Sequence, residues 1–365
     1  IDQYFLVLTT IDLFVLTFMC ILTKLSETLN GKQKRGFFLA FALIGVISIL
    51  EVITILVDGA PVHLRCLNIL SNYLGFGLSP AVSACLVYAL DKKTVISRKF
   101  KAAVGCEVVY LLLLTALLPS GMVFSVSEDN VYARGPYFAF YIVMYLAALA
   151  YLAVSTIVTA WEFQNRSRVL LYPLIVFLAA ETIIQIALPQ LHVTWLCVTL
   201  LSVLYFIYCS EMWNQLDALT GLLNQNSYLN RTAEMRRSGE VLVVFDVDDF
   251  KQVNDRYGHV KGDICLAEIA ACIKKAMRAT VLLRMGGDEF CVLLRDGDWE
   301  HACARDFVRR LDERRKELDF LPTVSFGSAE ISNENVVTVK DAPTKHDRYK
   351  KERKAHRMSG DAGEE

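Results

Sequence analysis

Two carboxylates and a pair of glycines in the second half of the chain have the residue types of a metal and nucleotide site. Asp246 ends an apolar run that predicts a buried strand, and Asp288 follows Gly286 and Gly287 between two short strand-like runs. If these strands are neighbours, the two carboxylates face each other. Two converging carboxylates with no cysteine or histidine ligand suit Mg²⁺ or Mn²⁺, whose remaining ligands are commonly substrate phosphates.

The residues around this pair fit the same chemistry. The glycines lack Cβ atoms, so a nucleoside triphosphate can approach the backbone closely. Lys251 follows Asp246 by five positions and is placed to meet phosphate charge. Any one of these aspartates taken alone is more often a cap or turn residue, so the prediction depends on the combination.

The elements that must position these residues form a mixed α/β pattern with a hairpin in the middle of the sheet. In chain order, the pattern predicts a strand, a helix, two strands of a tight hairpin, a charged helix and a last strand, at 241–245, 264–279, 280–285, 290–294, 299–318 and 322–331. The sequence therefore predicts one α/β domain in the charged half of the chain.

Four blocks in this half together resemble the GGDEF-domain diguanylate cyclases of bacteria. The blocks are DALTGLLN at 217–224, FDVDDFKQVNDRYGH at 245–259 with Gly262-Asp263, RMGGDEF at 284–290 and VSFG at 324–327. They occur in the order and at the spacing of the family, and they cover residues 215–330. The combination is far more specific than any single block.

The resemblance implies a nucleotide-cyclase-like α/β fold and a defined reaction. Two GTP molecules would condense into cyclic di-GMP with release of two pyrophosphates. Each domain would hold one GTP, so the reaction would require a homodimer. By the match, Asp246, Asp288 and the main-chain carbonyl of Val247 would bind Mg²⁺ or Mn²⁺, two ions per active site.

The resemblance also assigns catalytic and phosphate-binding roles. Glu289 would assist at the metal site or activate the 3′-hydroxyl, with Asp288 and Lys251 as the other catalytic residues. Lys251 and the backbone amides near Asp249 and Phe250 would hold the phosphates.

Asn254 and Asp263 are the predicted guanine-reading residues. An aspartate accepts two hydrogen bonds from the guanine edge, whereas adenine offers no such pair of donors, so Asp263 would favour GTP over ATP. His259 is expected to be structural, because these metals prefer oxygen ligands. Asp217 is expected to be a contact or cap where the domain begins.

Three stretches depart from the family pattern. Met277–Thr280 stands where the family has its Arg-x-x-Asp product-inhibition motif and lacks both charged residues, so product inhibition there is not expected. Gln225 replaces a usual Arg, with a small expected effect. In the closing segment Lys345–Arg353, Glu352 occupies the usual lysine position three residues after Tyr349. The alternative hypothesis is therefore a catalytically degenerate GGDEF domain that binds GTP or a protein partner.

The first half of the chain has a different character. The chain has 365 residues, of which 54% are hydrophobic and 21% charged, and its formal net charge is −1. These values exclude a wholly basic nucleic-acid-binding protein and disfavour a single soluble globule. Seven apolar segments are near or above the length that spans a bilayer: 4–23, 37–57, 67–90, 102–123, 137–160, 169–188 and 190–209.

Loop charges predict the orientation of these spans. Basic residues gather in the loops 24–36, 91–101 and 161–168, whereas the alternate loops hold acids such as Asp58. Basic loops face the cytoplasm. We therefore expect a multi-pass protein of the bacterial cytoplasmic membrane, with its N-terminus outside and residues 210–365 in the cytoplasm. Ten scattered cysteines without a CxxC pair favour buried thiols in a reducing compartment.

Four carboxylates fall inside the apolar segments, namely Asp12, Glu51, Glu107 and Glu181. Such groups usually face the interior of a helix bundle or a wet cavity. They indicate either a pocket for a sensory ligand, which the sequence does not identify, or hydrogen bonds between helices. A transporter with an accessory domain would need a transport path, which these scattered residues do not define.

The predicted organisation is an all-α seven-span sensor or anchor domain at 1–209, a helical linker at 210–216, a GGDEF domain at 217–358 and a disordered tail at 359–365. Apolar side chains recur every four residues through the linker, at Leu204, Tyr208, Met212 and Leu216. This stripe predicts one continuous helix that leaves the membrane. It would pair with a second copy or pack against the soluble domain.

Overall fold

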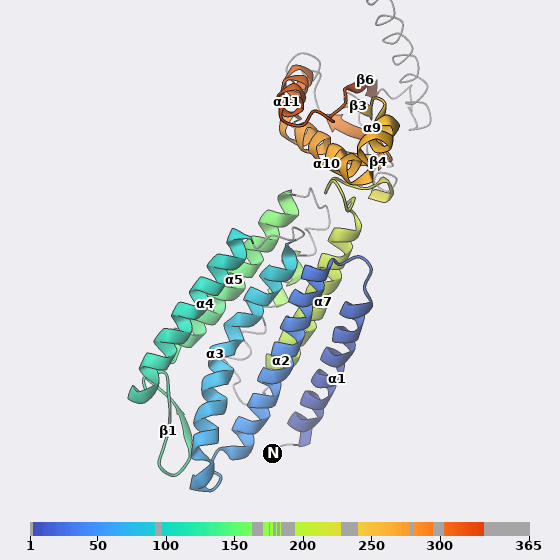
Figure 1. The fold of residues 1–365 in the computed structure, drawn as a ribbon. Coiled ribbons are helices and arrows are strands. Elements are labelled where there is room, and N and C mark those ends of the chain that lie inside the picture. The colour runs from blue at the N-terminus through green and yellow to red at the C-terminus, as the bar shows by residue number, and fades with distance from the viewer. Residues whose placement is uncertain are drawn as a thin grey trace, which may run out of the picture. The chain divides into compact units, whose positions relative to one another are not determined.

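The computed structural model describes residues 3–91, 97–162, 194–227, 240–277, 281–294 and 303–331, with a few positions between 171 and 183. The chain divides into two compact units, Ile1–Trp213 and Asn214–Glu365 (Figure 1).

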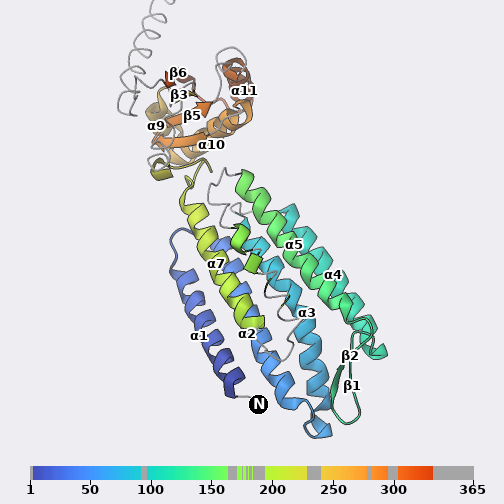
Figure 2. The same cartoon turned by 180° about the vertical axis from the view of Figure 1, so that it is seen from behind.

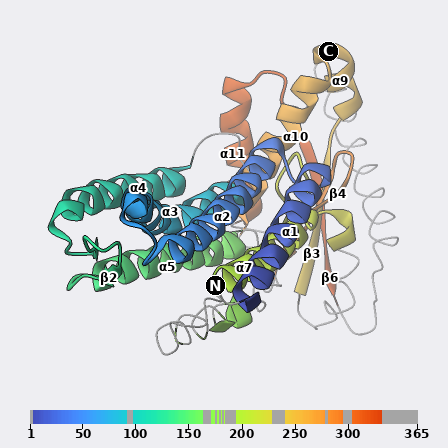
Figure 3. The ribbon, with the colours of Figure 1, turned by 90° about the horizontal axis from the view of Figure 1, so that it is seen from below.

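The first unit is a bundle of long apolar helices (Figures 1 and 2). They are α1 (Gln3–Leu25), α2 (Gly31–Val57), α3 (Arg65–Leu90), α4 (Arg98–Leu117), α5 (Ala139–Glu162) and α7 (Thr194–Asn214). Six stretches of the described residues, each built on one of these helices, are long and apolar enough to cross a membrane. Figure 3 shows the same helices from below.

These helices coincide with six of the seven predicted spans. Most of the other predicted span, 169–188, lies outside the described residues, as does Glu181, so the seventh span stays a prediction. The linker predicted to be helical over 210–216 is helical only to Asn214, where α7 ends, and Leu216 lies beyond the helix in a β-bridge with Leu223. The product-inhibition positions 278–280, the closing segment Lys345–Arg353 and the tail 359–365 also lie outside the described residues.

The helix α2 begins earlier than the predicted span because its polar first turn is well satisfied. Asn30 caps the helix by accepting hydrogen bonds from the backbone N–H groups of Lys32 and Gln33, and the Gln33 side chain returns a bond to the Asn30 backbone. Lys32 is buried, and its Nζ lies 3.3 Å from Asp91 Oδ2 and 5.1 Å from the centroid of the Tyr88 ring. These partners compensate for burying the lysine.

A small hairpin follows α4, where the sequence predicted only a loop. Its strands β1 (Phe124–Val126) and β2 (Tyr132–Arg134) pair antiparallel. The turn residue Asn130 is fully buried with a left-handed φ of 62°, and its Nδ2 donates to the Val57 carbonyl at 2.6 Å. Asn68 of α3 donates to Asn130 Oδ1 at 3.0 Å. The hairpin therefore closes one end of the bundle through hydrogen bonds between residues far apart in the sequence, which local sequence patterns cannot predict.

The second unit is an antiparallel sheet with helices, as predicted. Its strands are β3 (Glu240–Val247), β4 (Val281–Gly286), β5 (Glu289–Leu294) and β6 (Val324–Ile331), in the order β4-β5-β3-β6. Its helices are α9 (Phe250–Tyr257), α10 (His259–Ala276) and α11 (Cys303–Glu317). The helix predicted to begin at residue 264 begins at His259, and the polar stretch before it forms α9.

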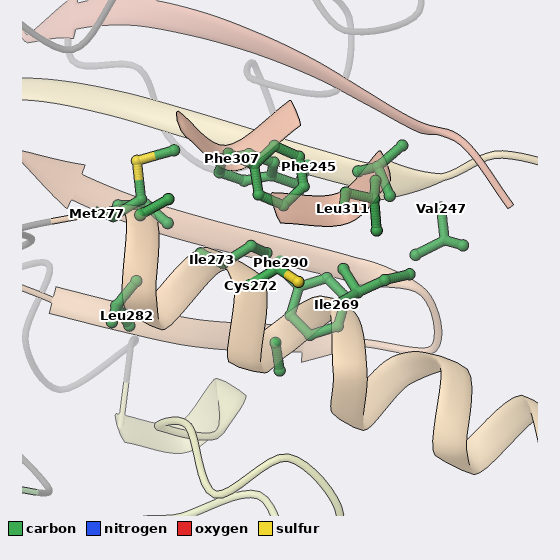
Figure 4. Close-up of a cluster of buried hydrophobic side chains, with 14 of the residues drawn as sticks. Phe245, Val247, Ile269, Cys272, Ile273, Met277, Leu282, Phe290, Phe307 and Leu311 are labelled. Carbon is green, nitrogen blue, oxygen red and sulfur yellow. The ribbon is translucent and has the colours of Figure 1, made fainter. Parts of the chain in front are cut away.

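The core of this unit lies between the sheet and its helices (Figure 4). Phe245 of β3, Phe290 of β5 and Phe307 of α11 are fully buried, and the Phe245 and Phe307 rings meet edge to face at 5.1 Å. Ile269 and Ile273 of α10 pack in the same cluster. Burial of each such side chain contributes about 1.5–3 kcal/mol to the stability of the fold. This core therefore holds in place the sheet that carries the predicted site.

The cysteines of this core behave as buried thiols. Cys265, Cys272 and Cys291 are free and buried. Burial raises the pKa of the Cys265 and Cys291 thiols to about 12. The described part of this unit thus agrees with the expectation drawn from cysteine spacing.

Candidate active site

The strand order brings Asp246 next to the glycine hairpin. Asp246 lies opposite Glu289 in the β3–β5 pairing and opposite Ser325 in the β3–β6 pairing. The Val247 N–H donates to the Asp288 carbonyl at 3.3 Å. Residues predicted to form the metal site, from two segments some forty positions apart, therefore meet at one end of the sheet.

The two carboxylates of this strand pair share a face of the sheet. Residues directly opposite in an antiparallel pair project to the same side, so the side chains of Asp246 and Glu289 are neighbours. Asp246 is 4% exposed, whereas Glu289 is exposed and Asp288 is partly buried. The described residues contain no group of three or more His, Cys, Asp or Glu side chains that could hold a metal. One or two carboxylates completed by substrate phosphates suffice for Mg²⁺, so the donor set fits that ion.

The hairpin between β4 and β5 leaves open space beside its backbone. Gly287 has a φ of +53° and Gly286 a φ of +154°, which are backbone conformations that favour glycine. A Cβ atom added at either position would meet no atom within 4 Å. A triphosphate can thus approach this turn without a side chain in the way.

Arg284 joins the hairpin to the segment that opens the unit. Its Nη1 lies 3.1 Å from Asp217 Oδ1, and its Nη2 donates to the Gly287 carbonyl at 2.6 Å. The Thr220 N–H and hydroxyl donate to the same Asp217 oxygen at 2.8 and 2.7 Å. Burial opposes ionisation, but the hydrogen bonds from Thr220 and the charge of Arg284 outweigh it and hold the pKa of Asp217 below its usual value. Asp217 is thus a structural contact, as expected.

The chain passes from β3 to α9 through a corner that Asp248 secures. The Asp248 N–H donates to the Thr323 carbonyl at 2.9 Å, and its carboxylate accepts from Thr323 Oγ1 at 2.7 Å and Ser325 Oγ at 2.6 Å. Asp249 then adopts a left-handed φ of 53° and precedes α9. Lys251 is exposed in the first turn of that helix.

Asp248 and Arg284 lie inside the quoted sequence blocks, but neither was predicted to be a functional residue. Their hydrogen bonds reach residues 75 and 67 positions away. In the sequence, the one signal for Asp248 and Arg284 is that they lie close to the predicted metal ligands.

The predicted guanine-reading residues lie where α9 packs on the start of α10. A Cβ atom at Gly262 would lie 2.0 Å from Asn254 Oδ1 and 3.3 Å from Phe250 Cζ, so both side chains rest against this glycine. Asp263 is the next residue and is exposed. Phe250, Asn254 and Gly262 are therefore brought together, and Asp263 adjoins them on α10.

Comparison with known proteins gives the same assignment. Residues 214–359 match the family described as diguanylate cyclase, GGDEF domain. The chain is 31% identical over 141 residues to the probable diguanylate cyclase DgcJ of Escherichia coli, which covers 37% of this chain and 27% of DgcJ. It is 43% identical over 91 residues to the diguanylate cyclase DgcS of Shewanella oneidensis, which covers 23% of this chain and 31% of DgcS. The chain thus spans less than a third of the length of these relatives.

One solved structure is similar to part of the chain. The GGDEF domain of DgcB from Caulobacter crescentus, in complex with c-di-GMP, is 26% identical with a TM-score of 0.30, over 33% of this chain and 78% of that one. The motif blocks all lie within the residues matched to the family, and their strands and helices bring them to one end of a sheet. Residues 214–359 therefore form a domain that matches the GGDEF-domain diguanylate cyclase family.

Proposed function

We propose that this protein is a membrane-bound diguanylate cyclase. It would condense two GTP molecules into cyclic di-GMP and release two pyrophosphates. The observation that supports the proposal is that Asp246 lies beside the glycine hairpin. Glu289, which follows that hairpin, pairs with Asp246 in the register of β3 and β5. Because each domain would hold one GTP, the active form would be a homodimer.

Asp246, Asp288 and the Val247 carbonyl would hold two Mg²⁺ or Mn²⁺ ions. When bound, these ions would offset the negative charge that develops on the attacking 3′-oxygen and on the pyrophosphate. The near-complete burial of Asp246 supports a ligand role, because it holds the carboxylate in one place. Glu289, exposed at the same end of the sheet, would accept the proton of the 3′-hydroxyl.

The first turns of the two helices would bind the nucleotide. The backbone N–H groups near Asp249 and Phe250 begin α9, and Lys251 adds a positive charge there, so the phosphates would lie at this helix start. Asn254 and Asp263 would read the guanine edge. The packing of Asn254 on Gly262 supports this role because it fixes the side chain relative to Asp263.

The helical unit would anchor the enzyme in the lipid bilayer and regulate it in response to a sensory ligand that remains to be identified. We propose seven spans in the bacterial cytoplasmic membrane, with the N-terminus outside and the GGDEF domain in the cytoplasm. The six apolar helices support a multi-pass arrangement. The basic loops support the orientation, and no nucleic-acid partner is expected.

The test is formation of cyclic di-GMP from GTP and Mg²⁺ by the detergent-solubilised full chain. Asp288→Ala should lower the rate by about 100-fold or more, as expected when a group that stabilises transition-state charge is lost. Asp312→Asn is the matched control, since Asp312 is an exposed carboxylate of α11, paired with Arg315 away from the site.

GTP binding measured in parallel separates the alternatives. Product from the wild type and the control but not from Asp288→Ala supports the cyclase and its site. Equal product from all three contradicts the site assignment. Binding without product from any of them favours the degenerate GTP-binding domain.

A further inference from the structure

A cavity lies inside the helical unit, between α3, α5, α7 and the described residues 171–174. Its volume is about 60 Å³. Its lining is almost entirely apolar, with side chains from all four segments: Leu86, Leu149, Leu152, Leu171, Leu201 and Tyr205. Half-buried residues such as Ala153 and Ile157 also line it, so the cavity opens toward the outside of the bundle. The cyclase chemistry uses none of these residues.

Water is a poor occupant of this cavity. A volume of roughly 10–15 Å³ holds one water molecule, but each water needs about two to four polar partners. Thr156 and Tyr205 are the only polar side chains among the described lining residues, and their hydroxyls already bond each other at 2.9 Å. Thr156 Oγ1 also donates to the Leu152 carbonyl at 2.8 Å. The lining therefore favours an apolar occupant.

A positive charge lies near one end of the cavity. Lys99 of α4 donates from its Nζ to Thr159 Oγ1 of α5 at 3.0 Å, and its carbonyl accepts from the Tyr151 hydroxyl at 2.9 Å. Thr159 follows Thr156, which lines the cavity, by three positions, or about 4.5 Å along the helix axis. Among the described residues, no carboxylate pairs with Lys99. An anionic group on the occupant would supply that partner.

We propose that the cavity binds one long-chain fatty acid, with its chain between α5 and α7 and its carboxylate at Lys99. The lining runs along α5 from Leu149 to Ile157, about 12 Å, so it can enclose a chain over that length. Burial of the chain supplies affinity, and the ion pair sets the preference for a carboxylate. A phospholipid carries two chains and a larger headgroup, whereas this single space lies below the last turn of α5.

The site is placed to act on the helix that leaves the bundle. Leu201 and Tyr205 belong to α7, which continues without interruption to Asn214, where the second unit begins. Leu152 and Thr156 of α5 line the same space. A bound chain would therefore change how α7 packs on α5. Its effect on cyclic di-GMP formation rests on the proposed function, whereas fatty-acid binding does not.

The test measures binding of radioactive dodecanoate to the purified full chain in phosphatidylcholine nanodiscs, with empty nanodiscs as the blank. We expect saturable binding of one dodecanoate per chain. Ala153→Phe fills the cavity from its edge and should weaken binding by about tenfold or more. Ala150→Phe is the matched control, since Ala150 is an exposed residue of the same helix, and it should bind as the wild type does.

Lys99→Gln tests the charge apart from the cavity. It should weaken dodecanoate binding by about tenfold. It should leave unchanged the binding of dodecanol, which has the same chain without the charge. Lys101→Gln is the matched control, because Lys101 is an exposed lysine of α4, and it should change neither affinity. Equal dodecanoate binding by Lys99→Gln and the wild type would overturn the assignment of an anionic ligand.

Absence of saturable binding by the wild type, or wild-type binding by Ala153→Phe, would overturn the site. If Ala153→Phe does not fold, Leu201→Trp fills the cavity from α7, with the exposed Leu200→Trp as its control, and the same outcomes apply. Phosphatidylglycerol added to the nanodiscs should not displace dodecanoate, and displacement would show that a bilayer phospholipid fills the cavity instead. None of these readouts requires GTP turnover, so failure of this site is distinguishable from failure of the cyclase proposal.

Discussion

Arg284 and Asp217 form an ion pair that ties the first motif of the C-terminal unit to its glycine hairpin. Arg284 Nη1 lies 3.1 Å from Asp217 Oδ1, while Nη2 holds the Gly287 carbonyl at 2.6 Å. Asp217 stands three residues after α7 ends at Asn214. The same guanidinium thus contacts the start of the unit and the turn that precedes Asp288.

Asp217→Asn should therefore reduce both stability and turnover. The substitution removes a charge-assisted pair that is only partly exposed, so we expect a loss of about 1–2 kcal/mol in the free energy of unfolding of this unit. Because the Gly287 turn loses one support, cyclic di-GMP formation should fall by about tenfold. Hydrogen exchange of the β4 and β5 amides in the full chain, together with the rate, checks this. The control Asp312→Asn should change neither the exchange nor the rate of cyclic di-GMP formation. A wild-type rate in Asp217→Asn would show that the ion pair does not support catalysis.

The same carboxylate predicts a pH dependence of definite sign. The pKa of Asp217 is lowered in the folded chain, so its ionised form stabilises the fold. That contribution is complete above the unfolded carboxyl pKa of about 3.9 and is lost as the pH falls through the lower folded value. Hydrogen exchange of β4 below pH 4 should thus become more alike in the wild type and Asp217→Asn. If the difference in exchange rate between the two proteins grew as the pH fell, the lowered pKa of Asp217 would be contradicted.

Gly262→Ala should damage guanine recognition while leaving the fold intact. The new methyl group would lie 2.0 Å from Asn254 Oδ1, the far end of a side chain that can rotate away. Alanine within α10 also favours the helix by about 1 kcal/mol, so Tm should not fall. We expect GTP affinity to drop about tenfold and the preference for GTP over ATP to shrink, measured by nucleotide binding to the full chain.

Gly105→Ala is the control for this experiment. Gly105 is also in a helix, and a Cβ atom there would meet nothing within 4 Å. Both substitutions add the same methyl group, so a loss of GTP preference in Gly262→Ala alone would trace to Asn254. An unchanged preference in Gly262→Ala would mean that Asn254 does not read the base.

Local patterns predicted the sheet well because its strands are apolar and its turn contains glycine. Val241–Phe245 and the residues around Gly286 and Gly287 carry these signals in the sequence itself. The helix α9 was missed because Phe250–Tyr257 is mostly polar and has one buried residue, Val253. Hydropathy cannot reveal a helix whose apolar face is so narrow.

Contacts between distant residues were beyond the reach of these patterns. Asn130 reaches Val57 across 73 positions, and Arg284 reaches Asp217 across 67. The predicted metal site at Asp246 and Asp288 depended on their strands being neighbours, which the sequence could state only as a condition and which the order of β5 and β3 decides.

Asp248→Ala should reveal how far the corner before α9 controls the phosphate site. The carboxylate accepts from Thr323 Oγ1 and Ser325 Oγ, and its loss leaves both hydroxyls without this partner. We expect about 1–3 kcal/mol less stability and a several-fold rise in the KM for GTP, because Asp249 and Phe250 lose their anchor. Ser325→Ala removes one of the two bonds and should show a smaller change of the same kind. A KM equal to that of the wild type in Asp248→Ala would show that the corner is held by other contacts.

Asp246→Asn tests the metal ligand apart from catalysis. Asparagine is close in size, so the buried position can accept it, but it lacks the charge that a divalent cation requires. Turnover should fall by about 100-fold or more. In the wild type, Mg²⁺ with a non-hydrolysable GTP analogue should raise Tm, since a ligand that binds only the folded state stabilises it. Addition of EDTA should reverse that rise, and Asp246→Asn should not show it. A metal-dependent rise that persists in the variant would move the ligand role from Asp246 to the residues of the hairpin.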